Sequence, residues 1–201
     1  TEFLIASLWD TLNSDMNGGK TTKWTPMENN ASEKDMWKAA IDLFAEIWDR
    51  ASEKWKTTMR FIPWNHDQLV TTPLNTTMEF VFKKHDSVDV QWDWDTRQYH
   101  RFWNNLIWLT HWDTVKPKDL PNIMVNESSQ SWVKHRERYL WHRHKMIAED
   151  IWWTLVTSLP AVCEKNKWWK DFWVDLTNNI VSWTIHDKKF WREALLFEHI
   201  K

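Results

Sequence analysis

The chain has 201 residues and a formal net charge of −2 at pH 7, a length that suits one large domain or two small ones. The near-neutral charge argues against a dedicated nucleic-acid binder, which normally carries a strongly basic face. There are 20 Trp but only 2 Gly, where about fourteen Gly are usual for this length, so the composition disfavours phosphate loops and other tight loops that depend on positive φ.

The N-terminal third is predicted to be mainly helical. Apolar residues at helical spacing predict a short helix over 1–16, followed by a polar loop. The clearest helix is expected over 32–59, where a good N-cap precedes an apolar stripe that repeats every three or four residues. Pro63 and Pro73 then predict an irregular connection, because proline ends or breaks helices.

The pattern changes to a period of two after this connection. Residues 78–83 and 88–94 each alternate between apolar and polar positions, which predicts a β-hairpin with one buried face. Trp92 and Trp94 would lie on that face, beside Asp residues on the other. Paired Trp beside carboxylates could bind a sugar ring, but packing onto helices is the commoner role of such a face.

Most of the remaining chain is predicted to be helical, with a short third strand at 123–125. The helical patterns occupy residues 95–112, 129–159, 161–177 and 179–199. We therefore expect one α+β domain over 1–201 that is predominantly helical, with five or six helices packed with a small antiparallel β-hairpin or sheet. Any weak subdivision would fall near 113–130.

The Trp residues divide into two groups by their expected burial. Most fall on faces predicted to be buried, and are chiefly core residues: Trp37, Trp48, Trp55, Trp92, Trp94 and Trp103. Others face inward less clearly, and exposed aromatic surface is expected there: Trp108, Trp112, Trp141 and Trp168.

Residues 132–146 hold the most concentrated chemistry, with five basic residues and one Glu among aromatic residues. On a helix, Arg136, Arg138 and Arg143 together with Trp141 could bind an anionic surface or ligand through phosphate contacts and stacking. The favoured interpretation is a solvated helix face, since Lys and Arg are good helix formers and their stems cover apolar surface.

His135, His142 and Glu149 share a seam of the same predicted helix. Their seven-residue spacing is about 10.5 Å along the axis, too far for one ion, so a metal site would need ligands from another element. We expect no metal and no cofactor, and a metal-dependent hydrolase built on these residues is the weakest alternative. Cys163 is the only cysteine, which excludes an internal disulfide, and it lacks a recognisable catalytic partner.

No apolar run approaches the roughly 20 residues of a membrane-spanning helix, and no secretory signal pattern opens the chain. These features suit a cytoplasmic protein, or one made by soluble recombinant expression. No specific biochemical function follows; amphipathic patterning with scarce Gly and no motif suggests a designed or purely structural protein. The alternative is a non-catalytic binding module for an apolar or aromatic ligand, or an anionic surface, that uses Trp side chains and the basic helix 132–146. Enzymatic activity stays open but is disfavoured.

Overall fold

The structure is a computed structural model that divides into two compact units, Thr1–Thr96 and Arg97–Lys201. The single domain expected over 1–201 stays a prediction. The described residues are 2–7, 12, 14–15, 18–27, 29, 31–63, 66–111, 115–128, 133–141, 147–159, 180–186 and 192–199.

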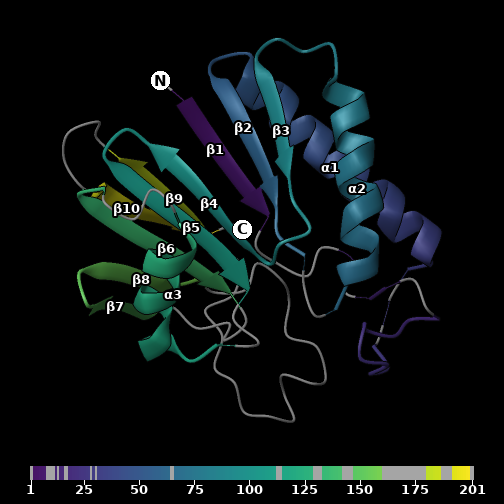
Figure 1. The fold of residues 1–201 in the computed structure, drawn as a ribbon. Helices are drawn as coiled ribbons and strands as arrows, with labels where there is room; N and C mark the ends of the chain where they lie inside the picture. Colours follow the sequence, from purple (N-terminus) through teal and green to yellow (C-terminus); the bar gives the residue numbers. More distant parts are fainter. Residues whose placement is uncertain are drawn as a thin grey trace. The chain divides into compact units, whose positions relative to one another are not determined.

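Unit 1 is a β-α-β-α-β arrangement (Figure 1). Its elements are β1 (Glu2–Ser7), α1 (Glu33–Ser52), β2 (Lys56–Phe61), α2 (Gln68–Phe82) and β3 (Val88–Trp92). The three strands form a parallel sheet in the order β1-β2-β3. Parallel neighbours need a long crossover connection, and the two helices provide it.

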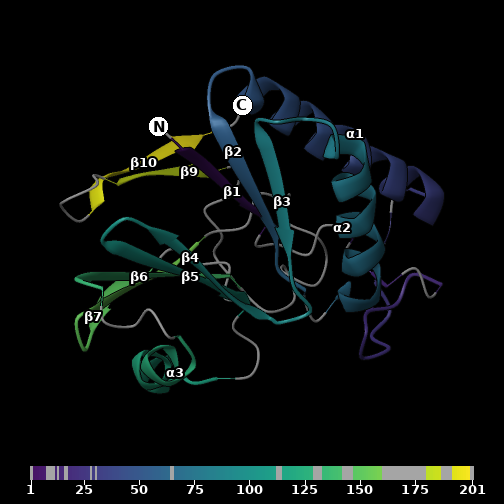
Figure 2. The same cartoon turned by 45° about the horizontal axis from the view of Figure 1, so that its top comes forward.

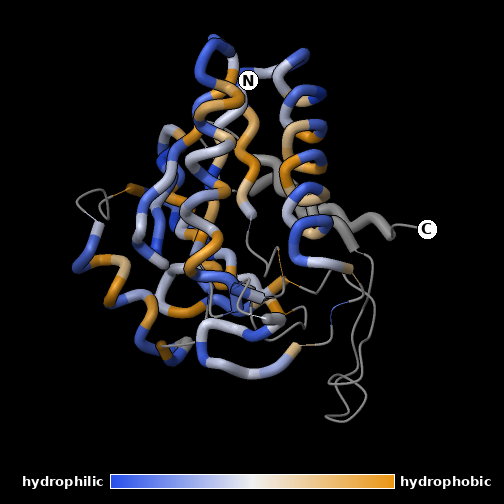
Figure 3. The backbone as a smooth tube through the Cα atoms, turned by 90° about the vertical axis from the view of Figure 1, so that its right-hand side faces the viewer, coloured by the Kyte–Doolittle hydropathy of each residue, from blue (hydrophilic) through white to orange (hydrophobic). Residues whose placement is uncertain are grey.

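The core of unit 1 lies between the two helices and one face of the sheet. Trp48 from α1, Met59 from β2 and Met78 from α2 are fully buried in one hydrophobic cluster. The Phe44 ring stacks on Trp48 with centroids 4.9 Å apart and meets Phe61 edge-on at 5.0 Å. In Figure 3, hydrophobic and hydrophilic residues alternate along the helices, as amphipathic packing requires.

Helix α1 confirms most of the helix predicted over 32–59. The Ser32 hydroxyl accepts a hydrogen bond from the Asp35 N–H at 3.2 Å, which caps the first turn. The prediction overruns the C-terminal end, because residues 56–61 are strand β2. Met59 lies between Ile5 and Val90 in the parallel register, so pairing on both sides outweighs the helical spacing.

Two further predictions for unit 1 are wrong. Residues 2–7 form strand β1 rather than the start of a helix, because they pair in parallel with β2. Residues 68–82 form helix α2, with Pro73 inside it, so the predicted hairpin does not exist. Its buried face repeats every four residues, which outweighs the apparent alternation: Val70, Leu74, Met78 and Phe82 are buried, and Phe80 is exposed.

Unit 2 is built on a five-stranded mixed sheet. Its elements are β4 (Arg97–Phe102), β5 (Asn105–His111), the short 3-10 helix η1 (Pro117–Asp119), α3 (Leu120–Glu127), β6 (His135–Trp141), β7 (Ile147–Ile151) and β8 (Thr154–Ser158). The sheet order is β4-β5-β6-β8-β7, with β5, β6 and β8 parallel and both edge strands antiparallel. Strands β9 (Ile180–His186) and β10 (Arg192–His199) form a separate antiparallel pair.

Helix α3 covers one face of the five-stranded sheet (Figure 2). Leu120 and Met124 of this helix are fully buried against Leu106, Trp108 and Leu140. The third strand expected at 123–125 is therefore wrong, because those residues belong to α3.

The predominantly helical fold is also wrong. The described residues contain three α-helices and ten strands, so the fold is α+β without the five or six helices expected. Residues 97–102, 105–111, 135–141, 147–151 and 154–158 are strands within two predicted helices. All seven residues of β5 are buried, and a strand buried on both faces shows no period of two. The helix predicted over 161–177 lies outside the described residues, and β9 and β10 occupy much of the one predicted over 179–199.

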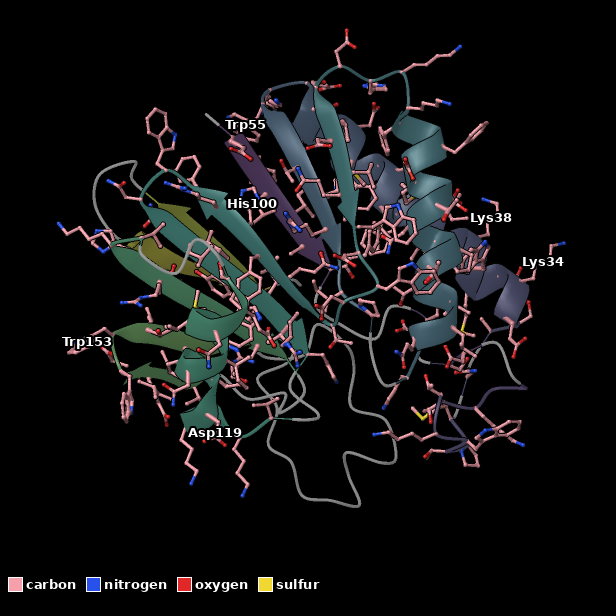
Figure 4. All side chains as sticks on the ribbon, in the orientation of Figure 1. Lys34, Lys38, Trp55, His100, Asp119 and Trp153 are labelled. Carbon is pink, nitrogen blue, oxygen red and sulfur yellow. The ribbon has the colours of Figure 1, made fainter. Side chains whose placement is uncertain are left out.

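Several Trp residues have the opposite exposure to that expected. Trp108 is fully buried, although it was a candidate for exposed surface. Trp94 is 68% exposed and Trp103 60% exposed, although both were assigned to the core, and Trp55 is also exposed. Figure 4 shows Trp153, in the turn between β7 and β8, pointing away from the ribbon. The assignment to the core holds for Trp48.

Candidate functional site

The basic segment 132–146 is a central strand rather than a helix where the structure describes it. Side chains alternate across a strand, so Arg136 and Arg138 of β6 lie on one face and His135 on the other. The predicted basic helix face is therefore wrong. Arg143 lies outside the described residues, and only the strand position of Trp141 is described.

Arg138 lies in a row that crosses the sheet. In the strand register it is opposite Trp108 of β5, which is opposite Tyr99 of β4; on its other side it is opposite Val156 of β8. Trp108 and Val156 belong to the hydrophobic cluster under α3, so this row lies on the face that the helix covers. Arg138 is 1% exposed, which is unusual for an arginine.

The Arg138 guanidinium stacks on an aromatic pair. Its Cζ atom lies 3.7 Å from the centroid of the Trp108 ring. The Tyr99 ring stacks on Trp108 with centroids 5.4 Å apart and an interplanar angle of 23°. Because β4 and β6 flank β5, Trp108 lies between the phenol and the guanidinium. A desolvated cation–π contact of this kind stabilises by about 2 kcal/mol.

Glu127, the last residue of α3, accepts hydrogen bonds from two residues of β4, Tyr99 and Arg97. Its Oε2 accepts hydrogen bonds from the Tyr99 hydroxyl at 3.0 Å and from Arg97 Nε at 2.9 Å. Its Oε1 lies 2.8 Å from Arg97 Nη2, which completes a bidentate ion pair. This carboxylate is therefore already engaged by Arg97.

The Arg138 guanidinium has no carboxylate hydrogen-bonded to it among the described residues. Its Nε and Nη1 atoms are buried and have no hydrogen-bond partner among the described residues. Burial lowers the pKa of Arg138 well below its ordinary value, to about 8; Tyr99 opposes this shift, Arg97 adds to it, and Glu127 opposes it. Removing an ion from water costs several kcal/mol unless a counter-ion and hydrogen bonds offset it. The site therefore has surplus positive charge and unused donors.

Among the described residues, the other predicted site residues do not form a metal site with Arg138 and its neighbours. Glu149 is exposed on edge strand β7, in register with Val156, and so shares the face of Arg138. His135 lies on the opposite face, so it shares no seam with Glu149, contrary to the prediction. His142 lies outside the described residues, as does Cys163. No group of three potential metal ligands occurs in the part of the chain that the structure describes.

The Trp92–Trp94 pair does not form the buried platform expected of it. Trp92 is half-buried and its Nε1 donates to Glu79 Oε2 at 3.1 Å, whereas Trp94 is mostly exposed beyond the end of β3. The two rings meet at 64° with centroids 5.8 Å apart. Their arrangement is a tilted surface pair, so it offers no flat double platform for a sugar.

The sequence pattern indicates Arg138 and Trp108 separately, and it indicates neither Tyr99 nor Glu127 as a site residue. Tyr99 and Trp108 fall within a range predicted as helix, and Glu127 drew no attention. These residues come from separate elements, and which elements are neighbours depends on the strand order, which no local sequence pattern contains.

The Tyr99 hydroxyl should cause part of the loss of stability at alkaline pH. Burial raises the pKa of Tyr99 above its ordinary value of 10, and the hydrogen bond to Glu127 raises it further. Above pH 10 the unfolded chain therefore binds fewer protons than the folded chain, so the free energy of unfolding falls as pH rises. Urea unfolding on both sides of pH 10 should show a shallower fall for Tyr99→Phe, and an equal fall in both proteins would contradict this role.

A comparison with protein-family models found no match, and searches of curated proteins and of solved structures returned no similar protein. Among the described helices, none combines the length and apolar character needed to cross a membrane.

Proposed function

We propose that the protein is a non-catalytic binding module that takes a small oxyanion, or the carboxylate or phosphate group of a larger ligand, at Arg138. The observation that carries this proposal is a buried guanidinium whose Nε and Nη1 donors have no partner among the described residues. A guanidinium presents its donors in a planar fork that matches two oxygens of a carboxylate or phosphate.

The surroundings of Arg138 support binding of an anion. Two arginines, Arg97 and Arg138, share the single carboxylate of Glu127, and only Arg97 pairs with it through hydrogen bonds. The stack on Trp108 fixes the plane of the guanidinium, which lowers the entropy lost when a ligand binds. The hydroxyl and carboxylate nearby are already hydrogen-bonded to each other, which favours binding over catalysis.

Thermal unfolding in the presence of inorganic phosphate tests this function. A ligand that binds only the folded state stabilises it, by about 2.7 kcal/mol at a hundred times its Kd, so phosphate should raise the unfolding midpoint of the wild-type protein. Arg138→Lys should weaken the response, because lysine keeps the charge but loses the fork and the flat stack. Arg101→Lys changes an exposed arginine on β4 and should respond as the wild type does. An equal response in all three proteins would refute the proposed site.

A purely structural protein, natural or designed, is the second candidate. The stack of Arg138 on Trp108 favours it, because a cation–π contact offsets part of the burial penalty without any ligand. This candidate predicts that phosphate moves the unfolding midpoint of no variant.

A further inference from the structure

Every residue with a left-handed backbone in the described part of the chain is either Gly or Trp. The two glycines, Gly18 and Gly19, have φ of 62° and 72°. The non-glycine residues with positive φ are all tryptophan, with φ between 52° and 64°: Trp24, Trp103, Trp152 and Trp153. In this region the Cβ of an L-residue crowds the following carbonyl, so glycine is the usual occupant and a bulky residue is an outlier.

The turns themselves require this backbone conformation. Ile151 pairs with Thr154, so Trp152 and Trp153 form a two-residue hairpin loop between β7 and β8. A two-residue loop with positive φ at both positions matches the twist of its strands, and it normally contains Asn-Gly or Gly-Gly. Trp103 is the first residue of the two-residue loop between Phe102 and Asn105, where only the first position has positive φ, the position that glycine normally occupies in a II′ turn. The strand pairing therefore fixes the left-handed φ, whichever side chain is present.

Burial does not compensate for the strain at these positions. The side chains of Trp24 and Trp103 are 65% and 60% exposed, and those of Trp152 and Trp153 are 71% and 81% exposed. Apolar surface left in water gains little from folding. Neither the backbone nor the packing of these turns thus favours tryptophan.

The composition of the whole chain also indicates that tryptophan stands at positions where glycine is expected. The chain lacks most of the roughly fourteen glycines expected and has a large surplus of tryptophan. If one codon means glycine in the cells that make the protein and tryptophan in the code used to translate it, glycines written with that codon appear as tryptophan. Glycines written with other codons stay glycine. We propose that Trp24, Trp103, Trp152 and Trp153 are glycine in the protein as its own cells make it. Trp108 has no left-handed φ and falls outside this inference.

Substitutions in the β7–β8 loop test the proposal. Trp152→Gly and Trp153→Gly should each raise the folding equilibrium constant by about five- to thirtyfold, the factor that corresponds to relief of one left-handed residue. Trp152→Ala and Trp153→Ala should give little gain, because alanine keeps the Cβ. Trp94→Gly is the matched control: Trp94 is 68% exposed but has no positive φ, so glycine there should not stabilise. Glycine variants no more stable than the alanine variants would overturn the proposal.

The mass of the tryptic peptide 146–165, purified from the cells that naturally make the protein, gives a second and independent readout. This peptide contains both Trp152 and Trp153. The proposal predicts a peptide lighter than the printed sequence requires, by two exchanges of tryptophan for glycine. A peptide at the full tryptophan mass would overturn it, whatever the stability of the variants.

Discussion

Replacing Arg138 by methionine should raise the stability of the protein and abolish its response to phosphate. The substitution removes a charge that is 1% exposed and lacks hydrogen-bond partners for two of its nitrogens among the described residues. Methionine is unbranched and flexible enough to fill the same space beside Trp108. Replacing a buried ion pair by apolar groups of similar volume is often neutral or stabilising by 1–4 kcal/mol, and the lost cation–π contact offsets about 2 kcal/mol, so a gain of up to about 2 kcal/mol is expected.

Urea unfolding without added anions measures the Arg138→Met effect. Arg101→Met serves as its control, because Arg101 is exposed on the same sheet, and it should stay within about 0.5 kcal/mol of the wild type. A loss of several kcal/mol in Arg138→Met would show that the guanidinium is satisfied in the folded protein. The site would then carry no unused charge for a ligand.

Phe44→Ala should strongly destabilise unit 1. Phe44 is 2% exposed and its ring contacts both Trp48 and Phe61, so truncation leaves a cavity between α1 and the sheet. Large-to-small changes of this kind cost about 3–5 kcal/mol. Hydrogen exchange should show the loss of protection in α1 and β2.

The matched control for this prediction is Phe80→Ala. Phe80 lies on α2 of the same unit but is 78% exposed, so its truncation should change the free energy of unfolding by less than about 0.5 kcal/mol. Similar losses in both variants would mean that α1 and the sheet do not share the core described above.

The elements that the sequence predicts well are those whose signals are local. Helix α1 has an N-cap at Ser32 and an amphipathic stripe, and both can be read from neighbouring residues. The period of two predicts strand β3 correctly. Its parallel pairing with β2 depends on the crossover helix α2, which was not predicted because Pro73 indicated an irregular connection.

The strands of unit 2 were not predicted because the turns between them lack the residues that usually indicate a turn. Turn prediction relies on Gly, Asn, Asp and Pro, yet the left-handed positions of the β4–β5 and β7–β8 loops hold Trp103, Trp152 and Trp153. Without those signals, β4 and β5 merged into one apparent helical pattern, and β6, β7 and β8 merged into another. The excess of tryptophan and the lack of glycine thus account for the main error in the predicted fold.

The candidate site was predicted only in part. The density of basic residues drew attention to Arg138, but its burial depends on the central place of β6 in the sheet. That Tyr99, Trp108 and Glu127 lie near Arg138 follows only from the strand order and from the crossover through α3. Local sequence patterns contain neither the strand order nor the crossover.

The most direct test of the Arg138 site is the NMR resonance of its Nε–H group during a titration with inorganic phosphate. The resonance is identified by its loss in Arg138→Met. Because Nε has no protein acceptor among the described residues, a phosphate oxygen that binds there should shift this resonance in a saturable way. A resonance that stays in place throughout the titration, while exposed arginines such as Arg101 shift only weakly with salt, would contradict anion binding at Arg138.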